Sequence, residues 1–197
     1  MITIGLDVGK ETDPAALAVL HTHGDLRDGS HRPRWSALSI GNIALGTRYQ
    51  ELATMVVTLG REFGVAGYSV LIVIDATGIG AAVVELARDA GPDLHIVAVT
   101  ISGGRALSHA GPDDYVVGKH RLTEVLQVAL QQQGLTIPET DGTRAFRDQL
   151  GRFVAKRTRT GYQQHEASTG HDDLVLAVEL ALWAGDTMFD QHAGVTT

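Results

Sequence analysis

The sequence predicts an α/β layer fold built on a mixed β-sheet of five or more strands flanked by helices. Two observations carry this prediction. Short apolar runs with strand-like spacing lie close together near the N-terminus. The apolar residues then change to the spacing of amphipathic helices, and these helices alternate with further strands.

The first three strands are expected to form an antiparallel meander. Turn residues at Gly9 and Asp13-Pro14 separate the first two, and the polar stretch 22–34 predicts a loop before the third. These strands are expected at Ile2–Asp7, Ala15–His21 and Trp35–Ile40.

Helices and strands alternate after this meander. Apolar residues at helical spacing predict amphipathic helices over 47–63, Ile79–Ala87 and Leu122–Leu130. Nearly continuous apolar runs predict buried strands at Ser69–Ile74 and Leu94–Val99.

The remaining segments are expected to be a loop over 100–118, a short helix over Asp141–Leu150 and a hairpin over Phe153–Glu166. The last helix, Leu174–Trp183, is apolar almost all round, so we expect it to be buried on most sides. Its small residues suggest a close approach to the sheet; they are Ala177, Ala181 and Ala184.

Length and composition indicate one globular domain over 1–197. The sequence has no cysteine, which excludes disulfides and thiolate zinc sites. No apolar run reaches the ~20 residues that span a bilayer, and no leader is recognisable, so no membrane partner and a cytoplasmic location are expected. The net charge of −7 argues against a protein that coats nucleic acid over its whole surface.

Two aspartates end predicted buried strands. Asp7 closes the first strand and Asp75 closes the fourth. Ligands of α/β sheets bind beyond the carboxyl ends of strands, so a parallel pairing would bring both carboxylates to one edge. The alternative is that each aspartate only starts a turn.

A third acidic group, His171-Asp172-Asp173, precedes the buried helix. Helix capping accounts for one aspartate, but less well for two beside a histidine. Clustered carboxylates repel one another unless a cation compensates them. Oxygen ligands without cysteine favour Mg²⁺ or Mn²⁺, and two such ions can catalyse phosphodiester hydrolysis.

At these places the sequence resembles the nuclease domain of the large terminase subunit of tailed phages. The pattern is a first-strand aspartate, a hydrophobic-Asp-x-Thr-Gly-x-Gly segment and a late His-Asp-Asp that opens a helix. The matching stretches are Ile4–Gly9, Ile72–Gly80 and Gly170–Ala177. Each motif is weak alone, but the ordered set is fairly specific and spans nearly the whole chain.

The resemblance implies an RNase H-like fold and metal-dependent endonuclease cutting of concatenated viral DNA in the host cytoplasm. Asp7 and Asp75 become the strand ligands and Asp172 the helix ligand, which also matches the helix acid of RuvC-type resolvases. Asp173 becomes a second ligand or positions water. His171 orients a carboxylate or water, or has only a capping or surface role.

The family also implies partners: double-stranded DNA, the terminase ATPase domain, the small terminase subunit and the portal. This sequence departs from the full subunit because it contains no P-loop; the segment Gly5–Glu11 has the wrong length and lacks the Ser/Thr. We therefore expect an excised or separately encoded nuclease domain that cuts DNA without translocating it.

Basic residues cluster before the last helix, which favours contact with DNA phosphates. The alternative is a solvated helix face and a charged hairpin. The cluster consists of Arg144, Arg147, Arg152, Lys156, Arg157 and Arg159, with Lys119 and Arg121 as further candidates.

Other functions stay open from the sequence. A RuvC-like junction resolvase would prefer four-way junctions. The segment Ile4–Gly9 also resembles a phosphate loop of actin-like ATPases, although those proteins need two such domains. A non-catalytic module that binds DNA or the portal is the third. In Thr77–Gly80, the glycines more simply allow a tight turn beside Asp75 than bind a nucleotide.

Overall fold

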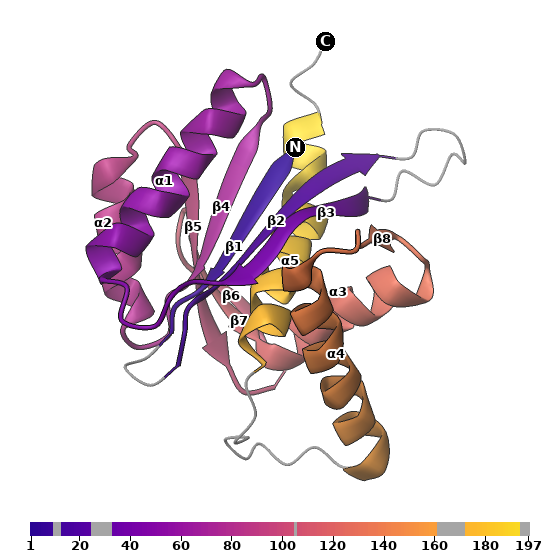
Figure 1. Ribbon diagram of the computed structural model, residues 1–197. Coiled ribbons are helices and arrows are strands. Elements are labelled where there is room, and N and C mark those ends of the chain that lie inside the picture. The colour runs from indigo at the N-terminus through magenta and orange to yellow at the C-terminus, as the bar shows by residue number, and fades with distance from the viewer. Residues whose placement is uncertain (10–12, 25–32, 105, 161–171, 194–197) are drawn as a thin grey trace.

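The computed structural model describes residues 1–9, 13–24, 33–104, 106–160 and 172–193. Within these ranges, one mixed sheet has the strand order β6-β7-β5-β4-β1-β2-β3-β8 (Figure 1). The strands are β1 (Ile2–Asp7), β2 (Ala16–Gly24), β3 (Pro33–Asn42), β4 (Val70–Asp75), β5 (His95–Ser102), β6 (Leu107–Gly111), β7 (Asp114–Gly118) and β8 (Leu135–Thr136). The helices are α1 (Tyr49–Val65), α2 (Gly80–Ala90), α3 (Lys119–Gln131), α4 (Asp141–Thr160) and α5 (Asp173–Ala193).

The sheet combines both kinds of strand pairing, as predicted. The strands β1, β2 and β3 form the antiparallel meander. The strands β1, β4, β5 and β7 pair in parallel, and β6 closes that edge in antiparallel orientation. The α/β fold with a mixed sheet is therefore confirmed.

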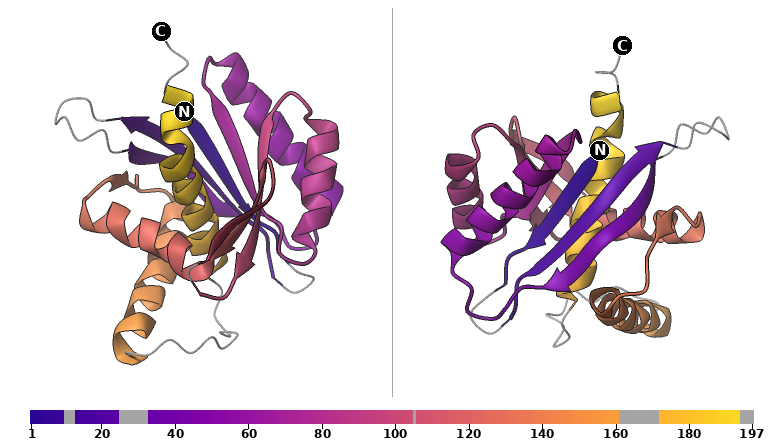
Figure 2. Two further views of the ribbon diagram at one scale, coloured as in Figure 1. Left: turned by 180° about the vertical axis from the view of Figure 1, so that it is seen from behind. Right: turned by 45° about the horizontal axis from the view of Figure 1, so that its top comes forward.

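The helices form two layers on opposite faces of the sheet. Figure 2 shows α1 and α2 on one face and α5, α3 and α4 on the other. Side chains of β1 alternate between the two layers. Ile4 and Leu6 pack in the core under α1 and α2, whereas Gly5 lies under α5.

Helix α5 approaches the centre of the sheet very closely. A Cβ atom added to Gly5 would lie 2.1 Å from the carbonyl oxygen of Ala177 and 3.0 Å from the amide nitrogen of Ala181. Small residues on both sides are thus required for this contact, which confirms the close approach expected from the alanines of the last helix.

Three sequence-based expectations were wrong at least in part. The expected loop over 100–118 contains the end of β5 and the hairpin of β6 and β7. Side chains of β6 are mostly exposed at the sheet edge, so its sequence lacks the apolar alternation that marks a half-buried strand. Gly111-Pro112, interpreted as a loop signal, forms the turn of that hairpin.

The expected hairpin over Phe153–Glu166 was also wrong as far as the structure describes it. Helix α4 continues from Asp141 to Thr160, through a segment that mixes good helix formers (Ala, Lys and Arg) with poor ones (Gly, Val and Thr), so local propensity did not distinguish helix from strand there. The rest of that expected hairpin, 161–166, lies outside the described residues. The predicted loop over 22–34 was too long, because β2 runs to Gly24 and β3 starts at Pro33.

None of the described helices is long and apolar enough to cross a bilayer.

Replacing Gly5 with alanine tests the contact between β1 and α5. We expect Gly5→Ala to lower the free energy of unfolding by at least ~1–3 kcal/mol, because the added methyl group overlaps the backbone of Ala177. The matched control is Gly64→Ala in α1, where an added Cβ would have no heavy atom within 4 Å. The control should be neutral or slightly stabilising. Urea denaturation measures both, and equal effects would contradict the close contact.

Candidate metal centre

Asp7 and Asp75 lie side by side at one end of the sheet. Strands β1 and β4 pair in parallel, with Leu6 opposite Ile74, and each aspartate follows directly. Because side chains alternate along a strand, both aspartates face the α5 side: Asp7 shares its face with Gly5, and Asp75 shares its face with Val73, which packs against α5. The predicted convergence of the two strand aspartates is borne out in the geometry.

The start of α5 adds two further carboxylates to this end of the sheet. The amide of Leu176 donates to the carbonyl of Asp172 at 2.9 Å, so Asp172 stands at the N-cap and Asp173 opens the helix. Ala177, one turn further, rests on Gly5. The contact between helix and strand thereby brings Asp172 and Asp173 toward Asp7.

The carboxylates share one electrostatic field. Asp7 is only 8% exposed, and its pKa is raised from 3.8 to about 8. Burial is the largest cause of this rise. The negative charges of the neighbouring carboxylates raise the pKa further, in the order Asp75, Asp173 and Asp172, and Lys119 lowers it. This end of the molecule therefore carries more negative charge than Lys119 alone offsets.

The turn after β4 holds Asp75 in place. Oδ1 of Asp75 accepts a hydrogen bond from the amide of Thr77 at 2.8 Å, and the hydroxyl of Thr77 accepts one from the amide of Ile101 at 2.9 Å. Gly78 has φ +62°, and a Cβ on Gly80 would overlap the carbonyl oxygen of Asp75. The glycines thus form the tight turn beside Asp75 that we expected.

Lys119 lies beside the acidic cluster rather than on a separate basic surface. Its Nζ is 3.4 Å from Oδ2 of Asp172, and both side chains are partly exposed. Gly118 ends β7 directly before Lys119 begins α3, so the junction of β7 and α3 places the Lys119 ammonium beside the carboxylates. Arg121, two residues later, is exposed on α3.

Sequence analysis missed Gln149, which touches the start of α5. This α4 side chain is 8% exposed, and its Oε1 accepts a hydrogen bond from the amide of Leu174 at 3.1 Å. In the sequence, Gln149 is marked only by its position on the apolar side of an amphipathic helix. That position predicts burial but does not predict a hydrogen-bond partner on another helix.

The donor set fits a hard divalent cation. Carboxylate oxygens from β1, β4 and α5 are the ligands that Mg²⁺ and Mn²⁺ prefer. Burial first and the neighbouring carboxylates second raise the pKa of Asp7, and a cation at this place would favour its ionised form. Within the described ranges, however, no three acidic or histidine side chains already converge as a metal cage. The four carboxylates are close enough for Asp75, Asp172 and Asp173 to raise the pKa of Asp7. To coordinate one ion, their oxygens would have to move closer together. His171 lies outside the described residues.

The predicted basic residues of α4 are only partly free to contact DNA. Arg147 reaches Glu139 at 3.2 Å and the carbonyl of Ile137 at 2.8 Å. Arg144 lies 3.4 Å from Asp141, and Arg152 is exposed. The side chains of Lys156, Arg157 and Arg159 are not described, but their helical backbone is. The C-terminal half of α4 projects beyond the body at the end where β1 terminates (Figure 1).

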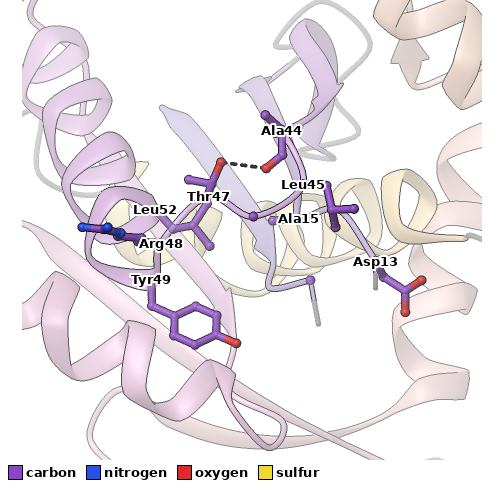
Figure 3. A pocket seen from close by; sticks show the side chains of 10 residues that line it. Asp13, Ala15, Ala44, Leu45, Thr47, Arg48, Tyr49 and Leu52 are labelled. Atoms are coloured by element: carbon purple, nitrogen blue, oxygen red, sulfur yellow. Dashed lines mark hydrogen bonds between the residues drawn. The ribbon is translucent and has the colours of Figure 1, made fainter. Parts of the chain in front are cut away.

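A hollow of about 300 Å³ lies at the same end of the sheet, between the residues just after β1 and just before β2 and the segment that leads into α1 (Figure 3). Gly9, Leu45, Tyr49 and Leu52 are among its lining residues. Leu52 belongs to the core under α1, on the opposite face from Asp7 and Asp75. The hollow is therefore separate from the carboxylate cluster.

We compared the chain with known protein families, curated proteins and solved structures. No protein-family model and no curated protein matches the sequence. A manganese-soaked human cytomegalovirus terminase nuclease domain is similar in structure, with a TM-score of 0.55 and 11% identity over 92% of this chain and 82% of that chain. The similarity confirms the RNase H-like fold that the family resemblance implied.

Two structures of Thermus thermophilus RuvC also align over nearly the whole of both chains. RuvC itself has a TM-score of 0.41 and 16% identity, covering 99% of this chain and 98% of that one. RuvC in complex with a Holliday junction substrate has a TM-score of 0.38 and 12% identity, covering 98% and 96%.

The buried carboxyl of Asp7 predicts an unusual dependence of stability on pH. Because its pKa is raised to about 8, the folded protein holds this proton more tightly than the unfolded chain, whose pKa is near 3.8. This contribution is fully present below pH 3.8 and is lost as the pH rises to about 8, at a slope of at most ~1.4 kcal/mol per pH unit. Without divalent metal, Asp7→Asn should therefore be more stable than the native protein at pH 8.

Thermal unfolding in EDTA between pH 4 and 8 measures this difference, which should shrink toward the acidic end. Asp89→Asn, at an exposed position on α2, is the matched control and should follow the native curve. A native protein that is no less stable than Asp7→Asn at pH 8 would contradict the electrostatic account.

Proposed function

We propose that this chain is a divalent-metal-dependent DNA endonuclease in which Asp7, Asp75, Asp172 and Asp173 bind Mg²⁺ or Mn²⁺. The observation that carries the proposal is the buried carboxyl of Asp7, whose pKa is raised to about 8 by burial and by the three other carboxylates. A site of this kind is costly to the fold unless a cation compensates it. The shared fold with a terminase nuclease domain supports the same reading.

At such a site, Asp7, Asp75, Asp172 and Asp173 would hold two ions, which would supply activation of water and stabilisation of the leaving oxygen in phosphodiester hydrolysis. The protein contributes ligands from two rigid sources, the ends of β1 and β4 and the first turn of α5. The Thr77 amide restrains rotation of the Asp75 carboxylate through its hydrogen bond to Oδ1. His171, next to Asp172, is in sequence position to orient a carboxylate or water.

Lys119 has two roles in the proposed site. Against Asp172 it offsets part of the negative charge. When cations occupy the carboxylates, Lys119 becomes available to a substrate phosphate, because its ammonium is partly exposed and stands at the rim of the cluster. A lysine at this place lets a polyanion approach an acidic site.

The substrate that best fits is duplex DNA. The exposed arginines of α4, on a helix that extends beyond the site, provide phosphate contacts without reading base sequence. The ordered motifs around Asp7, Asp75 and Asp172 favour a nuclease of the terminase type, which cuts concatenated viral DNA during genome packaging.

Removing one strand carboxylate tests the proposed catalysis. Asp75→Asn should abolish Mn²⁺-dependent cutting of plasmid DNA and leave the fold intact, because the amide loses the charge that holds the cation but keeps the side-chain oxygen that accepts from Thr77. Asp89→Asn should cut as the native protein does. Gel assays and circular dichroism measure both properties, and undiminished cutting by Asp75→Asn would end this assignment.

Salt dependence tests the role of α4. Arg152→Ala should weaken binding of unrelated duplex sequences equally, and should reduce the slope of log Kd against log salt by ~0.9 if this arginine contacts one phosphate. Arg61→Ala is the control, because Arg61 pairs with Asp93 at 2.6 Å near the far end of α1. Fluorescence anisotropy in EDTA measures both; the same slope in Arg152→Ala and the native protein would remove Arg152 from the DNA interface.

A further inference from the structure

The first turn of α5 is tied to α4 by one buried hydrogen bond. Oε1 of Gln149 accepts from the amide of Leu174 at 3.1 Å, and both side chains are shielded from solvent. Leu174 is the residue directly after Asp173, so this bond holds the backbone that carries the two helix carboxylates. It joins residues that are 25 positions apart in the sequence.

This bond replaces the usual arrangement at a helix start. The first amides of a helix have no partner within the helix, and an aspartate at the N-cap commonly accepts from them through its side chain. Here the amide of Leu174 donates to the side chain of Gln149, whereas the carboxylate of Asp172 accepts a hydrogen bond from Lys119. Gln149 thus takes over a capping task and leaves the Asp172 carboxylate available to face the site.

The N-terminal half of α4 is firmly attached, so Gln149 is a fixed point. Phe146, fully buried, and Leu150 pack in the same core cluster as Leu174. A Cβ on Gly142 would lie 2.0 Å from the carbonyl oxygen of Ile40, so the start of α4 lies directly on β3. The hydroxyl of Thr143 donates to the carbonyl of Pro138 at 2.6 Å, a bond local to the segment before α4 that touches neither Gln149 nor α5.

We propose that Gln149 is a positioning residue for the metal site: its side-chain oxygen holds the first turn of α5 so that Asp172 and Asp173 stay in register with Asp7. The inference rests on the proposed metal-dependent function. It also makes α4 contribute twice, through the arginines that face solvent and through the glutamine that faces α5.

The test compares a substitution that removes the acceptor oxygen of residue 149 with one that keeps it. Gln149→Met keeps the length of the side chain but cannot accept from the Leu174 amide, whereas Gln149→Glu keeps an acceptor oxygen. Mn²⁺ binding, followed by the electron paramagnetic resonance signal of the free ion, should weaken ~10-fold or more in Gln149→Met, as for other residues that orient ligands. Gln149→Glu should restore most of the affinity.

Two further measurements separate positioning from general destabilisation. Thr143→Val removes the hydrogen bond to Pro138 without touching α5, so it should lower the melting temperature of the protein but leave Mn²⁺ affinity unchanged. Gln149→Met should lower kcat at saturating DNA, while its Kd for DNA in EDTA stays at the native value, because the arginines of α4 are intact.

The outcomes distinguish this inference from the proposed function. A native protein that cuts DNA and binds Mn²⁺, together with a Gln149→Met variant that binds Mn²⁺ equally well, overturns the positioning role alone. Equal losses of Mn²⁺ affinity in Thr143→Val and Gln149→Met also overturn it. A native protein that neither binds Mn²⁺ nor cuts DNA overturns both proposals.

Discussion

The close packing of α5 on β1 is the constraint on which the rest of the structure depends. Gly5 has no side chain, and the backbone of α5 at Ala177 and Ala181 occupies the space that a Cβ would fill. Asp173 lies one helical turn before Ala177, and Asp7 lies two residues beyond Gly5. One contact between small residues therefore sets the position of the helix carboxylates relative to the strand carboxylates. A larger residue at Gly5 would lift the helix and separate the two groups.

The same packing carries an electrostatic cost. It places Asp7 where only 8% of the residue is exposed and where three other carboxylates act on it. A carboxyl with a pKa of about 8 holds its proton at neutral pH, and ionising it without a compensating cation works against folding. The apolar clusters on the two faces of the sheet must therefore offset the unfavourable free energy of the clustered carboxylates at the ends of β1 and β4. In the proposed function, tight cation binding and a fold that is most stable without the buried charge would be opposing demands.

Sequence patterns predicted the features that depend on local periodicity. The apolar runs that end at Asp7 and Asp75, and the buried helix that follows Asp173, each follow from the spacing of residues near one another. The β6–β7 hairpin was missed because an exposed edge strand has no buried face to produce alternation. The contacts of Lys119 with Asp172 and of Gln149 with Leu174 join distant segments. These contacts form only in the folded protein, so the spacing of neighbouring residues in the sequence does not predict them.

Charge distribution, rather than net charge, decides whether this chain can meet a polyanion. The sequence carries −7 overall, and part of that excess stands where a phosphodiester would have to lie in the proposed function. Two groups of basic residues would reduce the electrostatic repulsion between these carboxylates and a phosphate. Lys119 stands beside the carboxylates, and α4 carries exposed arginines beyond them. Because Gln149 of α4 also holds the start of α5, the helix that would attract DNA and the helix that supplies carboxylates are parts of one packed unit. In the proposed function, this arrangement would bring a phosphate to the carboxylates through Lys119 and α4, despite the net negative charge of the chain.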